Sequence, residues 1–138
     1  DYKLKWLESL VSHSKNLLSF EEITILGGDF NICPTDLDAA EPSLLMEDAI
    51  YQEEPKTIYR TLINEGYFDS YRCLNKEKPG YTYWDYGRAF TNNIGVRIDH
   101  FFMSSYALDL CEEVYVDKKP RSATKPSDHT PLCTIINL

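Results

Sequence analysis

The chain has 138 residues, of which 43% are hydrophobic and 13% are aromatic. This is the length of one ordinary domain with enough apolar residues to build a core, and the composition excludes a disordered chain. The formal net charge of −8 argues against a stand-alone nucleic-acid-binding protein, because such proteins usually present a basic face.

The charged residues are unevenly placed. Residues 36–54 hold seven acidic residues and no lysine or arginine, whereas residues 118–125 hold four basic residues and no acidic one. The basic stretch leads into Asp128 and His129. Its lysines and arginine can therefore be interpreted either as a local patch that faces phosphate or as an ordinary solvated loop. An acidic metal-binding loop is a weaker hypothesis for residues 36–54, because the spacing of an EF-hand is absent there.

Four cysteines, Cys33, Cys73, Cys111 and Cys133, are widely spaced and form no CxxC pair. This usage predicts reduced thiols in a cytoplasmic protein. The sequence contains no signal peptide and no run of about 18 apolar residues, so we expect no membrane span and no membrane partner. The chain begins at Asp1 without a methionine, and we expect it to be a piece of a longer protein.

The first elements are a helix and a strand. Residues 2–19 place leucine and valine at near-helical spacing, which predicts an amphipathic helix. Residues 23–26 form a short apolar run that ends at Gly27 and Gly28, which predicts a strand buried on both faces.

An irregular acidic segment and a second helix come next. Residues 38–54 show no clear periodicity apart from one possible helical turn at 44–49. A helix is predicted over residues 55–64, because Pro55 suits its first turn and Gly66 lies just beyond its end.

The rest of the chain predicts four strands and one helical patch. The strands are expected at 80–84, 96–104, 112–116 and 132–136, and the helical patch at 106–110. Buried strands that alternate with two long helices predict a layered α/β fold. Functional groups in such folds collect at strand ends, where the loops converge.

The first polar cluster follows the first predicted strand. Asp29 comes after two glycines that allow a tight turn, and Asn31 is two residues further on. A carboxylate here can hold or activate a water while the carboxamide donates to a phosphate oxygen. A local Asx-turn or helix cap is the competing interpretation.

The second cluster lies in an apolar strand. Asp99 is a carboxylate among hydrophobic residues, where an unpaired charge is costly. Arg97 or Arg88 could neutralise it structurally, or it could pair with His129 and set the tautomer of that imidazole. Strand alternation points His100 to the opposite face, so His100 is predicted to be structural.

The third cluster precedes the last predicted strand. The imidazole of His129 can bind a phosphoryl oxygen, and Asp128 can supply oxygen to a divalent metal ion. Together with Asp29, Asn31 and Asp99, these residues form the inventory for metal-assisted attack of water on a phosphodiester.

Residues 81–86 are rich in aromatic side chains and precede Val96. Core packing is the default for about half of such aromatic residues, and stacking on bases or sugars is the alternative. Exposed Tyr83, Trp84 or Val96 could form the wall of a pocket that accepts an extrahelical deoxyribose.

The motifs together resemble the exonuclease III family of class II abasic-site endonucleases, within the endonuclease/exonuclease/phosphatase superfamily. The similarity runs through essentially all 138 residues and rests on five segments in order: GGDFNICPTDLD, GYFDSYR, GYTYWDY, NNIGVRIDHFFMS and KPSDHTPL. The WDY, RID and KPSDH segments favour this branch over sphingomyelinase-like or inositol-phosphatase members.

The resemblance implies an enzyme, dependent on Mg2+ or Mn2+, that cuts double-stranded DNA 5′ to abasic sites and removes nucleotides from 3′ ends. By motif, Asp29 would orient or deprotonate the water, and Asn31 would assist at the phosphate. Asp99 would support His129, His129 would contact the scissile phosphate, and Asp128 would help to hold the metal.

The resemblance also implies a pocket for the abasic sugar. Tyr83, Trp84, Val96 and Ile98 occupy the positions expected to shape it. Some relatives carry a bulky aromatic residue where this chain has Val96, which leaves a smaller side chain in that wall.

By the same resemblance, residues 1–138 are the C-terminal half of a four-layer α/β sandwich, with one mixed sheet and flanking helices, and the N-terminal half is absent. That half supplies an asparagine, the main metal-binding glutamate and a phosphate-contacting tyrosine, which have no counterpart here. We therefore expect poor metal affinity, little activity and self-association through the exposed sheet face.

A catalytically silent interaction or folding module on the same scaffold is the alternative function. The retention of Asp29, Asn31, Asp99, Asp128 and His129 favours an active parent enzyme, because a silent scaffold would not need all five. The missing glutamate favours a lack of catalytic activity in the 138-residue chain by itself.

Overall fold

The computed structural model describes residues 2–138. The helices and strands follow in chain order: α1 (Tyr2–Leu18), β1 (Ile25–Asp29), α2 (Glu53–Glu65), β2 (Phe68–Asp69), α3 (Ser70–Leu74), β3 (Asp99–Met103), α4 (Ser105–Asp109), β4 (Cys111–Val116) and β5 (Leu132–Ile136). Short 3-10 turns lie at Asp36–Asp38, Pro42–Leu45, Ala49–Tyr51 and Pro120–Ser122.

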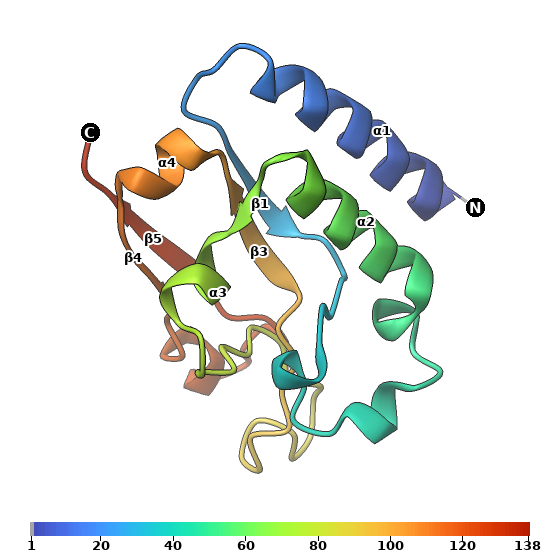
Figure 1. Ribbon diagram of the computed structural model, residues 1–138. Helices are drawn as coiled ribbons and strands as arrows, with labels where there is room; N and C mark the ends of the chain where they lie inside the picture. Colours follow the sequence, from blue (N-terminus) through green and yellow to red (C-terminus); the bar gives the residue numbers. More distant parts are fainter. Residues whose placement is uncertain (1) are drawn as a thin grey trace.

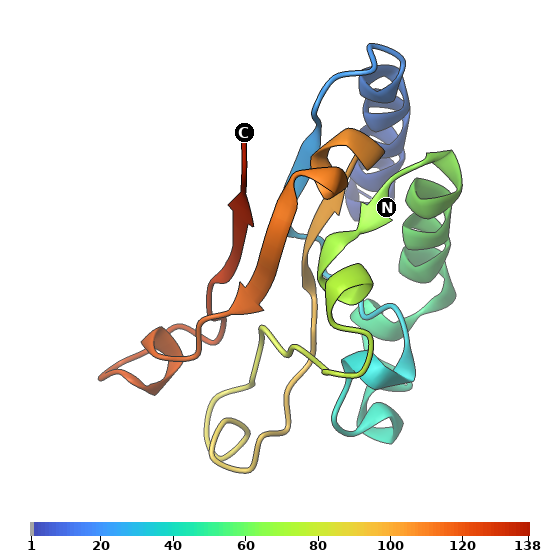
Figure 2. The same cartoon turned by 60° about the vertical axis from the view of Figure 1, so that its left-hand side comes forward.

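The elements form three layers. A three-stranded sheet has the order β1-β3-β2, and β4 pairs with β5 in a separate two-stranded sheet. Helices α1 and α2 contact each other and lie on one side of the three-stranded sheet (Figure 1). The β4-β5 hairpin lies on the other side, as the turned view shows (Figure 2). The three-stranded sheet is therefore the central layer.

Alternation along β3 distributes side chains to the two outer layers. Phe102 packs in the core under the helices, whereas Met103 and Phe101 pack with the cluster that includes residues of β4 and β5. Successive residues of a strand point to opposite faces. Asp99 consequently faces the side of the hairpin, and His100 faces the side of the helices.

The two long predicted helices are confirmed. The apolar stripe of α1 and α2 packs on a buried cluster around Leu62, Tyr67 and Phe102. Pro55 lies in the first turn of α2, and Gly66 ends the helix in the left-handed region at φ 117°. These residues act as the sequence predicted, because proline fits a first turn and glycine tolerates positive φ.

The first strand differs from the expectation. It runs over Ile25–Asp29, through both glycines, and its residues are mostly exposed rather than buried on both faces. Gly27 is needed inside the strand, because a Cβ there would lie 2.7 Å from the ring of Phe101. The strand is exposed because β1 ends the sheet and, in the part of the chain that the structure describes, pairs only with β3.

The expected single mixed sheet is also corrected, although the α/β class is confirmed. Every strand pair in residues 2–138 is antiparallel, and the strands are divided between two sheets. Strands that follow one another along the chain can pair antiparallel, as β4 and β5 do across the connection formed by residues 117–131. The strands predicted at 112–116 and 132–136 are confirmed within one residue, and the strand predicted at 96–104 is confirmed in its shorter form, β3 over Asp99–Met103.

Residues 80–84 do not form the predicted strand. Tyr83 makes only isolated bridges, one to Val96 and one to His129, so this extended segment links two loops without a continuous ladder. The short elements β2 and α3 were not predicted, because two strand residues and five helical residues are too few to show a period. No helix within residues 2–138 is long and apolar enough to cross a membrane.

Candidate active site

Two carboxylates meet at the ends of neighbouring strands. The antiparallel register places Asp29, the last residue of β1, directly opposite Asp99, the first residue of β3. The side chain of Asp29 is 39% exposed and that of Asp99 is 18% exposed. The sheet therefore offers one solvated carboxylate beside one that is largely withdrawn from water.

His129 joins the two carboxylates. Its Nδ1 lies 2.9 Å from Oδ2 of Asp99, and its Nε2 lies 3.7 Å from Oδ2 of Asp29. The charged carboxylate of Asp99 can only accept a hydrogen bond, so Nδ1–H donates to it. In the neutral imidazole this leaves Nε2 as an acceptor on the side of Asp29.

The hydroxyl of Thr82 supports this arrangement. It accepts hydrogen bonds from the backbone N–H groups of Ile98 and Asp99, each at 3.2 Å, while the carbonyl of Thr82 accepts from the N–H of Thr130 at 2.8 Å. One buried residue thus connects the strand of Asp99 with the segment that carries His129. Burial raises the pKa of Asp99, and hydrogen bonds from Thr82 and His129 oppose that increase.

Asn31 lies in the turn after β1. Its backbone N–H donates to Oδ1 of Asp29 at 2.9 Å, and its φ of 53° is in the left-handed region. The Asx-turn that competed with a functional role is therefore present. It does not occupy Oδ2 of Asp29, which is the oxygen nearest to His129. The turn fixes the rotamer of Asp29 and leaves one oxygen available.

Asp128 does not join this cluster. Its carbonyl accepts from the N–H of Trp84 at 3.0 Å, and its Oδ1 accepts from the hydroxyl of Ser127 at 3.4 Å. Among residues 2–138, the group whose donor atoms lie within 4.8 Å of one another consists of Asp29, Asp99 and His129. Two carboxylates fit a hard divalent cation that completes its coordination with water and phosphate oxygens.

The four pocket residues separate into two pairs. Tyr83 and Val96 line a cavity of about 400 Å³ between residues 41–50 and residues 83–96. Trp84 and Ile98 are 0% and 2% exposed and do not line that cavity. The ring of Tyr83 packs edge-on against His129 with centroids 5.2 Å apart, so the cavity adjoins the candidate active site.

The sequence did not reveal a buried ion-pair network. Arg97, which competed as a structural partner of Asp99, instead binds Asp38 through Nε at 2.7 Å and Asp69 through Nη2 at 2.7 Å. All three side chains are almost fully buried. Arg72 also pairs with Asp38. The arginine of the RID motif, Arg97, indicated a buried ion pair. Spacing in the sequence could not identify its partners, because they lie 28 and 59 residues away.

His100 is structural, as the alternation predicted. It is fully buried; its Nε2 lies 2.8 Å from the carbonyl of Ile32, and its Nδ1 lies 3.1 Å from Nη1 of Arg97. Arg97 can only donate, so Nδ1 accepts and Nε2–H donates, which is the neutral tautomer. Burial, followed by the charge of Arg97, lowers the pKa of His100 to about 4.

Comparison with known proteins supports the family resemblance that the sequence motifs indicate. The model of the Endonuclease/Exonuclease/phosphatase family matches residues 1–129. The chain is 30% identical over 141 residues to a DNA-(apurinic or apyrimidinic site) endonuclease of Dictyostelium discoideum, covering 100% of this chain and 38% of that protein. It is 29% identical to an exodeoxyribonuclease of Bacillus subtilis, covering 100% of this chain and 54% of that protein.

Solved structures agree with these similarities. A 3′ phosphatase from Neisseria bound to a product DNA hairpin has a TM-score of 0.94 at 30% identity, over 99% of this chain and 54% of that one. An AP endonuclease from Archaeoglobus fulgidus has a TM-score of 0.92 at 30% identity, with the same coverage. The chain thus spans about half the length of these structures. From its sequence match and its fold, the chain belongs to the Endonuclease/Exonuclease/phosphatase family.

Proposed function

We propose that this chain is the C-terminal half of a DNA-repair nuclease that hydrolyses phosphodiesters 5′ to abasic sites and removes nucleotides from DNA 3′ ends. The observation that carries the proposal is the alignment of Asp99, His129 and Asp29 beside an open cavity. The similarity to AP endonucleases and exodeoxyribonucleases supports double-stranded DNA as the substrate.

In this proposal the site residues position the water and the phosphate and stabilise the charge of the transition state. Asp29 holds and orients the attacking water through its free carboxylate oxygen. His129 points Nε2 toward the same space and binds the scissile phosphate, where a hydrogen bond stabilises charge that develops in the transition state. Asp99 orients the imidazole and stabilises its protonated form, and Asn31 donates its amide to the phosphate.

The proposed cofactor is Mg2+ or Mn2+, with Asp29 and Asp99 as the candidate oxygen ligands in this chain. When bound, such an ion would neutralise phosphate charge and lower the pKa of water. Asp128 stays a prediction as a further ligand, since its carboxylate lies outside the cluster of Asp29, Asp99 and His129.

The cavity next to Tyr83 is the proposed sugar pocket. Tyr83 and Val96 would contact the extrahelical deoxyribose, because both line the cavity and Tyr83 also packs on His129. Trp84 and Ile98 are buried and do not line the cavity, and Ile98 packs with Val96 and Tyr83 in one apolar cluster. We propose that they hold the wall in place and do not contact the substrate.

We further propose that this chain is incomplete as an enzyme. Strands β1 and β5 each pair on one edge only among the described residues, which suits completion by further strands from an N-terminal half. A second copy of the chain could cover the same edges and produce self-association. The four free cysteines suit a reducing compartment such as the cytoplasm.

A cleavage assay tests the function. A duplex oligonucleotide with one abasic-site analogue would be incubated with this chain, and separately with the chain extended by an N-terminal half, in Mg2+ and in EDTA. We expect cleavage only by the extended protein with metal, and its loss in an Asp29→Asn variant of that protein. Cleavage by neither protein would favour a silent module. Metal-dependent cleavage by the short chain would contradict its incompleteness.

A further inference from the structure

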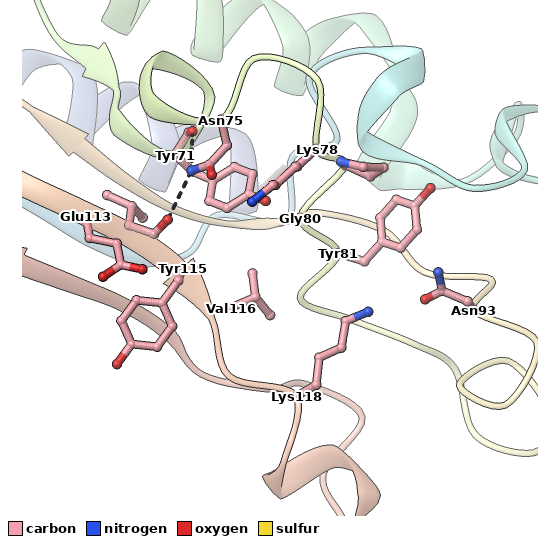
Figure 3. A pocket seen from close by; sticks show the side chains of 12 residues that line it. Tyr71, Asn75, Lys78, Gly80, Tyr81, Asn93, Glu113, Tyr115, Val116 and Lys118 are labelled. Carbon is pink, nitrogen blue, oxygen red and sulfur yellow. Dashed lines mark hydrogen bonds between the residues drawn. The ribbon is translucent and has the colours of Figure 1, made fainter.

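A second cavity lies between the loop after α3 and the edge of β4. Its volume is about 340 Å³, within the range of small-molecule sites, and its lining includes Lys78, Tyr81, Glu113 and Lys118. Figure 3 shows the side chains of both lysines directed toward the space between the loop and β4. Asp29, Asp99 and His129 do not line it, so it is separate from the candidate active site.

The loop wall of this cavity is held in place by Arg72. The guanidinium of Arg72 donates to the carbonyls of Asn75 at 2.8 Å and of Pro79 at 3.1 Å, and also to the carbonyl of Lys78. Gly80 has φ 72°, and a Cβ at this position would clash with the ring of Tyr71. The backbone that presents Lys78 is therefore organised before any ligand arrives, which lowers the entropic cost of binding.

The two lysines have no acidic partner. Among residues 2–138, neither Lys78 nor Lys118 forms an ion pair, and the ammonium of Lys118 lies 5.7 Å from the ring of Trp84. An anion that enters the cavity therefore meets two positive charges that no acidic side chain in the described part of the chain neutralises. Lysine is a common phosphate ligand because it presents a compact point charge.

The remaining lining suits a nucleoside. Tyr81 offers an aromatic ring on which a base can stack. Glu113 lies apart from Lys118 in Figure 3 and can accept hydrogen bonds from an amino group or sugar hydroxyl. The cavity thus has a cationic end and an acceptor end.

We propose that this cavity binds a nucleoside monophosphate, with the phosphate monoester between Lys78 and Lys118 and the base against Tyr81. The proposal does not depend on the nuclease function, because it uses none of the residues of the candidate active site. The phosphate chemistry could come from a free nucleotide or from inorganic phosphate, and the experiment separates these sources.

Calorimetric titration tests the proposal. The chain would be titrated with dAMP, with inorganic phosphate, and with an oligodeoxynucleotide that has no terminal phosphate, all in EDTA. We expect dAMP to bind more tightly than phosphate, and Lys78→Ala or Lys118→Ala to weaken dAMP about tenfold each, as for loss of one charge-assisted hydrogen bond. Matched variants of exposed lysines outside the cavity, Lys76→Ala and Lys119→Ala, should bind dAMP normally.

Three outcomes would overturn the proposal. One is the absence of dAMP binding at millimolar concentration, and another is dAMP binding that is lost in His129→Ala but kept in both cavity variants. The third is displacement of dAMP by the oligodeoxynucleotide, which would assign the cavity to a DNA strand. Recovery of binding in Lys78→Arg would show that the charge of residue 78, rather than its effect on folding, causes the loss.

Discussion

At the scale of single residues, the candidate active site consists of one imidazole and two carboxylates. Asp99 and His129 are 30 residues apart and are joined by a 2.9 Å hydrogen bond in a partly buried setting. Reduced solvent makes such a bond stronger than it would be in water. The more exposed Asp29 faces the other ring nitrogen, so the imidazole is oriented from one side and available on the other.

The first prediction concerns His129. In the proposed nuclease, with the chain extended by an N-terminal half, His129→Ala should lower the cleavage rate roughly 10²-fold or more, because one electrostatic contact to the transition state is lost. Single-turnover cleavage of the abasic duplex measures this directly. The control is His13→Ala on the exposed surface of α1, which should cleave at the parent rate. A rate within a few-fold of the parent for His129→Ala would remove His129 from the mechanism.

The second prediction concerns the pH dependence of stability through His100. Its folded pKa of about 4 lies below its unfolded value of 6.5, so the unfolded state binds more protons between these values. The stabilisation is therefore complete above pH 6.5 and is lost as pH falls toward 4, by about 3 kcal/mol for this residue. Urea denaturation at several pH values measures the change.

The control for this prediction separates His100 from the other titrating groups. A His100→Gln variant should lose much of the decrease in unfolding free energy between pH 6.5 and 4, whereas His13→Gln should retain it. Equal pH profiles for His100→Gln and the parent would show that His100 is not the group responsible.

At the scale of elements, a buried ion-pair network connects segments that are distant in the sequence. Arg97 precedes β3 and binds Asp38 of the first 3-10 turn and Asp69 at the end of β2. The N–H of Arg97 also donates to the carbonyl of Asp38 at 2.8 Å. These contacts position the loop that follows Asp29 and Asn31 relative to the strand of Asp99.

The third prediction tests this network. Arg97→Ala should destabilise the fold by roughly 3–5 kcal/mol, because it leaves two buried carboxylates without their partner. Arg60→Ala removes the exposed pair with Glu53 and should change stability by less than about 1 kcal/mol. Chemical denaturation of both variants gives the comparison. A loss of equal size for the two variants would contradict a dominant role for burial.

At the scale of the whole molecule, residues 2–138 form two sheets with unpaired edges. Within these residues, β1 lies at one end of its sheet, and β5 pairs only with β4. Ile25 and Ile135, one on each strand, are 37% and 43% exposed. Strand edges with exposed apolar residues favour association with another chain or segment.

The fourth prediction is self-association of the isolated chain. Sedimentation velocity should show a concentration-dependent increase in mass, and Ile135→Lys should weaken it, because a charge on an edge strand opposes pairing. Leu44→Lys is the control, since Leu44 is 71% exposed but lies in a 3-10 turn away from both strand edges. A monomer at all concentrations, or an equal effect of the two variants, would contradict association through β5.

The sequence by itself determined the local structure and the chemical inventory. Helical spacing predicted α1, and Pro55 and Gly66 predicted α2, because these signals act between residues that are close in the chain. Carboxylate, amide and imidazole residues next to apolar runs likewise marked Asp29, Asn31 and His129 as candidates.

Only the tertiary structure decided which of these groups meet and which residues are exposed. Strand register placed Asp29 opposite Asp99, and packing buried Trp84 and Ile98 so that neither lines the cavity. The edge position of β1 exposed a run that its composition had predicted to be buried. The physical reason is the same throughout: burial and long-range pairing depend on neighbours that are distant in the chain, and local patterns contain no information about them.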